Sequence, residues 1–103
     1  MKLNIKDRIN FVRFFPKEGG ILQQLIVKDI SKKIELTQEE AKEIELNQEG
    51  NQITWNPDKE VEKEVDLSEA ELNFLKEQVD LMDKEKRITQ DILDLCLLIK
   101  NLK

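Results

Sequence analysis

Hydrophobic residues recur at spacings of three and four in the first and last parts of the chain, and they alternate with polar residues in the middle. Spacings of three and four place apolar side chains on one face of a helix, whereas alternation places them on one face of a strand. The pattern predicts helices over residues 4–15, 20–33, 38–43, 69–83 and 90–102, a β-hairpin over residues 44–56, and a third strand or an extended connector over residues 61–67. We therefore expect an α+β fold in which helical N- and C-terminal parts flank a small antiparallel hairpin or three-stranded sheet.

Residues that commonly cap helix N-termini stand at the start of four predicted helices: Asn4, Thr37, Ser68 and Thr89. Two of them are followed three residues later by a glutamate, Glu40 after Thr37 and Glu71 after Ser68. This spacing is the capping box, in which the two side chains satisfy backbone N–H groups of the first turn. The helix over residues 38–43 is too short to be stable by itself, so we expect it to pack against its neighbours.

The length of 103 residues fits one domain, residues 1–103, with a single core. One cysteine excludes an intramolecular disulfide, and the opening residues MKLNIKDR lack the apolar segment of a secretory signal. The longest uncharged apolar run, LCLLI, is far shorter than the roughly 20 residues that span a bilayer. We expect a cytoplasmic protein without a membrane segment.

Charge is distributed unevenly along the chain, whose net charge is −5. Residues 1–33 carry eight Lys and Arg and three acids, whereas residues 34–103 carry nine Lys and Arg and nineteen acids. A basic segment can bind phosphate groups, but a basic segment that packs against acidic helices of its own chain has the same sequence pattern. The candidate phosphate contacts are Lys2, Lys6, Arg8, Arg13, Lys17 and Lys28.

The composition argues against most catalytic chemistry. His and Tyr are absent, which removes the commonest general base and the commonest ligand of transition metals. Cys96 lies in the apolar string DLCLLIK, where a thiol is usually a core residue rather than a nucleophile. Acidic residues are plentiful but lack the spacing of a calcium-binding loop. We expect a protein that is not an enzyme, with no cofactor and no metal site.

Gly19 and Gly20 interrupt the apolar pattern and raise the question of a phosphate-binding loop. They follow a predicted helix, and the spacings of the P-loop and of the dinucleotide-binding turn are both missing. A turn between two amphipathic helices explains the glycines better. Pro16 disfavours helical geometry at the residue before it, so the first helix should end at about residue 14 or 15.

Three short strings give the chain a likeness to a known group of proteins: PKEGG before an amphipathic helix, EGNQITWNP in the predicted hairpin, and KRITQDILDL before the last helix. With them the chain resembles small uncharacterised proteins of about this length encoded in bacteriophage and prophage genomes. The resemblance spans most of the chain and includes no catalytic motif. It implies a bacterial host cell and transfers no activity or functional residue.

Two functions fit this sequence. The first is a non-enzymatic accessory protein of phage or prophage origin that acts through protein–protein contacts. The alternative is a nucleic-acid or anion-binding module that uses the basic N-terminal third. Trp55 adds nothing to the alternative, because a single large aromatic in a small sheet is usually a core residue and RNA platforms present several aromatics.

The last predicted helix has more apolar residues than one face requires. A stripe with spacings of three and four accounts for part of them, whereas Leu93, Leu97 and Leu98 lie off that stripe. A helix that is apolar most of the way round is either buried centrally or shared between chains. Because closed two-fold dimers are the commonest assemblies, we expect a homodimer that self-associates through these three leucines.

Overall fold

The computed structural model describes residues 1–102. Within that range the α-helices are α1 (Ile5–Asn10), α2 (Ile21–Ile34), α3 (Gln38–Glu43), α4 (Glu69–Lys84) and α5 (Gln90–Asn101). Two short 3-10 helices complete the helical part: η1 (Phe11–Phe14) continues α1, and η2 (Pro57–Lys59) follows the hairpin. The first helical segment thus ends at Phe14, before Pro16, as the sequence predicts.

Four short strands within residues 1–102 form two separate antiparallel pairs. Strands β2 (Asn47–Glu49) and β3 (Gln52–Thr54) make the predicted hairpin, with Gln48 opposite Ile53. Strand β4 (Lys63–Glu64) lies within the predicted strand over residues 61–67 but pairs with β1 (Lys2–Leu3), which the sequence did not predict. The α+β class is confirmed, and the strand after the hairpin joins the N-terminus instead of extending the hairpin to three strands.

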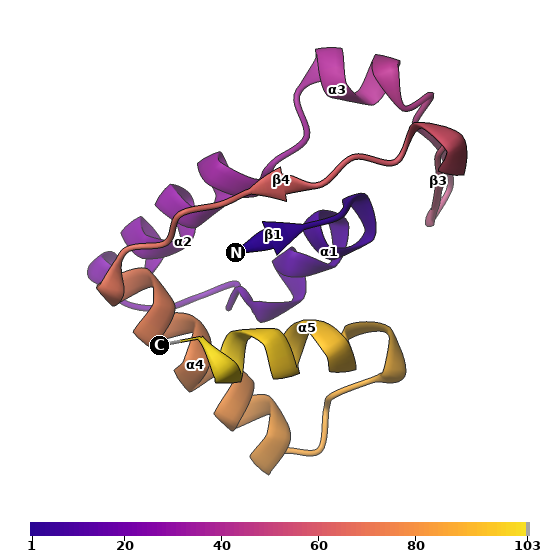
Figure 1. Cartoon of the computed structure of the whole chain (residues 1–103). Helices are drawn as coiled ribbons and strands as arrows, with labels where there is room; N and C mark the ends of the chain where they lie inside the picture. The colour runs from indigo at the N-terminus through magenta and orange to yellow at the C-terminus, as the bar shows by residue number, and fades with distance from the viewer. Residues whose placement is uncertain (103) are drawn as a thin grey trace.

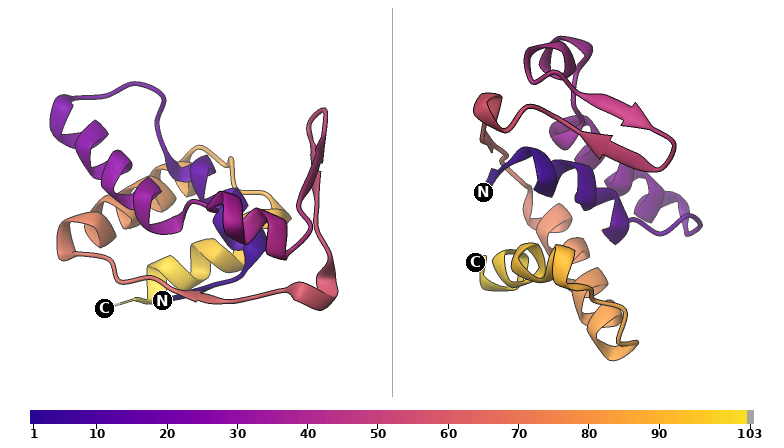
Figure 2. Two further views of the ribbon diagram at one scale, coloured as in Figure 1. Left: turned by 90° about the horizontal axis from the view of Figure 1, so that it is seen from above. Right: turned by 90° about the vertical axis from the view of Figure 1, so that its right-hand side faces the viewer.

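The helices enclose one core, and the hairpin stands apart from it. Helix α4 contacts α2, α5 and η1, and α1 contacts α5 and β1, so the first and last segments of the chain pack together (Figure 1). The hairpin projects from this body (Figure 2). The buried core residues are Leu3, Phe11, Phe14, Ile30, Ile34, Val65, Phe74, Leu75, Val79, Met82, Ile92, Leu95, Cys96 and Ile99.

Capping boxes start three of the helices. Thr37–Glu40 and Ser68–Glu71 form the reciprocal side-chain to backbone bonds that the sequence predicts, at the starts of α3 and α4. Asn4 forms a third box with Asp7 at the start of α1. Thr89 occupies the predicted N-cap position of α5, but its side chain forms no capping hydrogen bond.

Arg8 is buried, with 3% of its surface exposed, and it joins α1 to α2 and α3. Its Nε donates to the carbonyl oxygen of Ile34 at 2.8 Å and its Nη2 to that of Glu35 at 2.7 Å, which satisfies acceptors at the C-terminus of α2. Its Nη1 and Nη2 donate to the two carboxylate oxygens of Glu40 at 2.7 and 3.1 Å. Arg8 is therefore a structural residue and not a phosphate contact, contrary to the sequence expectation.

Lys33 forms a similar junction between α2 and α4. Its Nζ donates to Glu71 Oε1 at 2.6 Å and to the carbonyl oxygen of Asp66 at 2.9 Å. The same Glu71 oxygen accepts the backbone N–H of Ser68 at 2.8 Å. Burial raises the pKa of Glu71, but the bonds from Lys33 and Ser68 together hold it below its ordinary value. Both predicted capping-box glutamates thus also accept a bond from a basic side chain of the N-terminal third.

The pairing of Glu40 with Arg8 predicts a specific acid sensitivity. The hydrogen bonds from Arg8 lower the pKa of Glu40 from 4.5 to about 2. A folded-state pKa below the unfolded one adds stability that is complete above the unfolded value and is lost as the pH falls toward the folded value. We expect Glu40→Gln to be less stable than the wild type at pH 7, and the gap between them to narrow between pH 4.5 and pH 2.

Urea unfolding at a series of pH values measures this gap. The matched control is Glu39→Gln, an exposed neighbour on the same helix, which should follow the wild type at every pH. A gap between wild type and Glu40→Gln that stays constant down to about pH 2 would show that the ionised carboxylate of Glu40 adds nothing to stability.

Candidate interaction surfaces

Several large apolar side chains are exposed, and their grouping is more informative than their number. Among residues 1–102 they are Val12, Ile21, Leu22, Leu25, Val61, Leu81 and Leu97. Single exposed apolar residues are ordinary on protein surfaces, whereas a group on one face indicates a binding surface. Three of them lie within five consecutive residues at the start of α2.

We call Ile21, Leu22 and Leu25 the α2 apolar face. Their exposed fractions are 82%, 78% and 50%. The second half of α2 is anchored in the core by Ile30 and Ile34, whereas its first turns lie at the margin of the body, after the loop from η1 (Figure 2). The apolar pattern of α2 therefore begins before the part of the helix that packs against the core, and the apolar side chains of its first turns stay exposed.

The loop before α2 ends in two glycines, Gly19 and Gly20. Gly20 is the N-cap residue and contributes no side-chain bond. Neither Gly19 nor Gly20 has a positive φ angle, in contrast to Gly50 in the hairpin turn. The two glycines separate η1 from α2, as the sequence predicts.

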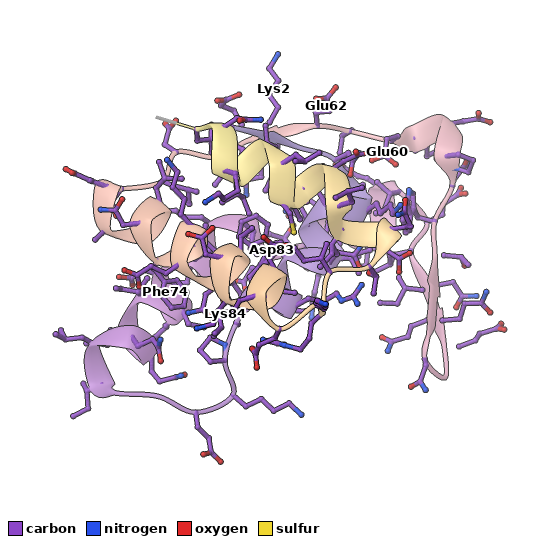
Figure 3. The ribbon with its side chains drawn as sticks, turned by 90° about the horizontal axis from the view of Figure 1, so that it is seen from below. Lys2, Glu60, Glu62, Phe74, Asp83 and Lys84 are labelled. Carbon is purple, nitrogen blue, oxygen red and sulfur yellow. The ribbon has the colours of Figure 1, made fainter. Side chains whose placement is uncertain are left out.

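A second apolar surface is the groove between α4 and α5, which has a volume of about 290 Å³. We call it the α4–α5 groove, and its lining residues are Val79, Asp80, Asp83, Ile88, Leu93, Cys96, Leu97 and Lys100. Asp80 and Lys100 pair across it, and Asp83 lies where the end of α4 faces α5 (Figure 3). The groove is therefore apolar with a charged rim.

The structure separates the three leucines proposed for self-association. Leu93 and Leu97 both line the α4–α5 groove, and Leu97 is 52% exposed. Leu98 is only partly buried but packs against the core. Two of the three residues thus share one accessible surface, and the third contributes mainly to the fold.

The six basic residues proposed as phosphate contacts are not equivalent. Arg8 is buried, and Arg13 lies 3.5 Å from Asp91 in an ion pair with α5. The other four are exposed and come from β1, α1, the loop before α2, and α2: Lys2, Lys6, Lys17 and Lys28. Lys2 points away from the body (Figure 3). The exposed lysines therefore come from four different segments.

Trp55 does not fill the core, which corrects the sequence expectation. It is only partly buried, and its Nε1–H donates to Glu60 Oε2 at 2.7 Å. Thr54 and Pro57 line the same open depression. The reason is that the hairpin projects from the helices, so no core lies behind the strand that precedes Trp55 (Figure 2).

The residues that could act as a nucleophile or bind a metal ion are buried or lie apart from one another in the described part of the chain. Cys96 is 3% exposed, and burial raises the pKa of its thiol. Within residues 1–102, no three acidic or cysteine side chains converge as metal ligands would. None of the helices in the described part of the chain is long and apolar enough to cross a bilayer.

Comparison with known proteins gives no relative from which a function could be inferred: no family model, curated protein or solved structure matches the chain.

Because the groove is open to solvent, two leucines of α5 should contribute very differently to the stability of the fold. Leu95 is 3% exposed, whereas Leu97 is 52% exposed. Truncating a buried leucine removes its packing and leaves a cavity, so Leu95→Ala should lower the free energy of unfolding by about 2–5 kcal/mol. Leu97→Ala should lower it by less than about 1 kcal/mol, because about half of the surface of Leu97 is already exposed to water.

Urea unfolding of the two variants measures both values. Equal losses would mean that Leu97 is as much a part of the core as Leu95, and the groove would then not be a free surface.

Proposed function

We propose that the protein acts without catalysis, through contacts with other proteins, as an accessory protein of a bacteriophage or prophage in its bacterial host. The observation that carries this proposal is the α2 apolar face, where Ile21 and Leu22 are 82% and 78% exposed. Covering such side chains with a partner is favourable by about 25 cal/mol for each Å² of apolar surface removed from water. The phage context is supported by the sequence resemblance alone.

The side-chain inventory agrees with a non-catalytic role. The chain has neither His nor Tyr, and its one thiol is buried. The carboxylates of Glu40 and Glu71 are both committed to helix caps and to ion pairs. Their lowered pKa values favour the ionised form, which suits a structural ion pair rather than a proton donor.

The alternative proposal is a nucleic-acid or anion-binding module. It is supported by the exposure of Lys2, Lys6, Lys17 and Lys28. It is weakened because both arginines of the predicted set have internal partners, Arg8 with Glu40 and Arg13 with Asp91. Arginine is the side chain best suited to bidentate binding of phosphate, so their engagement removes the strongest candidate contacts.

A capture experiment tests the first proposal. Immobilised wild type should retain a protein from a lysate of the host in near-stoichiometric amount, and the double variant Leu22→Gln/Leu25→Gln should not retain it. The matched control is Lys28→Gln, an exposed change on the same helix that leaves the α2 apolar face intact. Circular dichroism checks that all three proteins are folded.

Identical retention by the wild type and the double variant would contradict the role of the α2 apolar face.

A gel-shift titration with DNA and RNA over a range of salt concentrations tests the alternative proposal, since phosphate binding by lysines gives a steep salt dependence. Binding that weakens with salt and with Lys2→Gln/Lys28→Gln would favour the alternative over the first proposal.

A further inference from the structure

An open depression lies at the base of the hairpin. It has a volume of about 340 Å³, and its lining residues are Thr54, Trp55, Pro57 and Glu60. Trp55 is the only tryptophan of the chain and is not part of the core. Glu60 directly follows η2 (Figure 3) and bonds to the indole. The depression therefore presents an aromatic ring and a carboxylate side by side.

The bond between these two side chains determines which of their groups remain for a ligand. The indole Nε1–H donates to Glu60 Oε2 at 2.7 Å, and Glu60 Oε1 accepts the backbone N–H of Ile5, the first residue of α1, at 2.7 Å. An indole has one donor and no acceptor, so only the faces of its ring are left to bind a ligand. A carboxylate has about four lone-pair sites, so Glu60 keeps acceptor capacity beyond these two bonds.

An aromatic face beside a carboxylate suits a cationic ligand. The negative face of an indole attracts a guanidinium or an ammonium group, and a carboxylate accepts charge-assisted hydrogen bonds from either. Arginine combines both contacts, since its planar group stacks on an aromatic ring while its N–H groups donate. A metal ion fits less well, because no three acidic or cysteine side chains converge among residues 1–102.

The carboxylate of Glu60 is not neutralised within the molecule. Among residues 1–102 it has no ion-pair partner, and no basic side chain is among the residues that line the depression. Lys59 is its neighbour in the chain, but Lys59 pairs with Glu45 at 3.4 Å. The negative charge of Glu60 is therefore left for a ligand.

The end of the molecule that carries the depression is acidic as a whole. Helix α3, the hairpin and η2 lie at this end (Figure 1), and residues 35–64, which contain them, carry ten acids and three lysines. The acidic excess is still five when two cations from outside this range are counted, Arg8 paired with Glu40 and the N-terminal amine paired with Glu64. Such a field attracts cations and repels phosphate, which argues against a nucleic acid as the ligand.

We propose that the depression at Trp55 binds an arginine side chain carried by a basic segment of a partner protein. The guanidinium stacks on the indole and donates to Glu60, and further basic residues of the segment reach exposed acids on α3 and the hairpin, Glu43 and Glu49 among them. A segment that contacts several acids at once binds more tightly than a single small cation in an open depression. The proposal rests on the proposed function, a protein that acts through protein contacts, and deepens it by naming the chemistry of a partner.

The single tryptophan makes this site directly observable. The probe is a heptapeptide of alternating glycine and arginine with blocked ends, titrated into the full chain at about 0.15 M salt. Binding at the depression should change the fluorescence of Trp55 in a saturable way, and the same peptide with glutamate in place of arginine should have no effect. Anisotropy of a dye-labelled arginine peptide measures the affinity of every variant, including one that lacks the tryptophan.

Three variants separate the depression from the general acidic field. Glu60→Gln and Trp55→Leu should each weaken binding at least about fivefold, because the first removes a charged hydrogen-bond acceptor and the second removes the aromatic face. The matched control is Glu39→Gln, which removes an exposed charge of α3 outside the depression and should weaken binding less than about twofold. Circular dichroism establishes that each variant is folded, and Trp55→Leu tests the site if Glu60→Gln unfolds.

Four results would overturn the proposal. The arginine peptide does not bind the wild type, or it binds without changing the fluorescence of Trp55. Equal losses in Glu60→Gln and Glu39→Gln show attraction to the acidic field alone. Displacement of the peptide by spermidine at an equal concentration of charge shows a site for free polyamines. If the peptide fails to bind while capture from a lysate still depends on Leu22 and Leu25, this inference is refuted and the proposed function stands.

Discussion

The burial of Arg8 is the constraint on which the N-terminal half of the structure depends. A guanidinium removed from water has to find a hydrogen-bond partner for its donors, and leaving one partner of a buried ion pair alone costs about 3–5 kcal/mol. Arg8 meets this demand with four bonds to three residues in two other segments. Those bonds fix where α2 ends and where α3 begins relative to α1. The short helix α3, with no buried residue of its own, is held by the partner that it offers to Arg8.

A similar ion pair joins α2 to α4, and each of the two junctions pairs a basic residue of the first third with an acid that follows it in the chain. Glu40 and Glu71 cap their own helices and at the same time receive Arg8 and Lys33. Part of the positive charge of the first third is thus neutralised by acids that follow it in the chain. What stays exposed on α2 is Lys28 and Lys32 together with the α2 apolar face.

Local rules predicted most of the helices and strands, because their signals lie within a few residues of each other. The capping boxes at Thr37 and Ser68 are such signals, and both form as expected. Strand β1 could not be foreseen, since its partner β4 lies about sixty residues away and two residues give no periodicity. Leu97 was recognised as off the main stripe of its helix, and it is exposed.

What covers a given face could not be predicted, because periodicity shows that a helix has an apolar side but not what lies opposite. The start of α2 has the same pattern as its end, yet only the end meets the core. Trp55 was expected in the core because a large ring usually is buried, but the hairpin that carries it projects from the helices. Arg8 resembled the exposed lysines around it, and its burial followed from acceptors on α2 and α3 that no local pattern connects to it.

A double-mutant cycle on Arg8 and Glu40 tests this account most directly. The free energies of unfolding of wild type, Arg8→Met, Glu40→Met and the double variant give the coupling between the two side chains and cancel the bonds that Arg8 makes to backbone carbonyls. The account predicts a coupling of about 1.5–3 kcal/mol at pH 7, within the range measured for contacting charged pairs. A coupling near zero would show that Arg8 and Glu40 act independently, and the ion pair would then not be what joins α1 to α3.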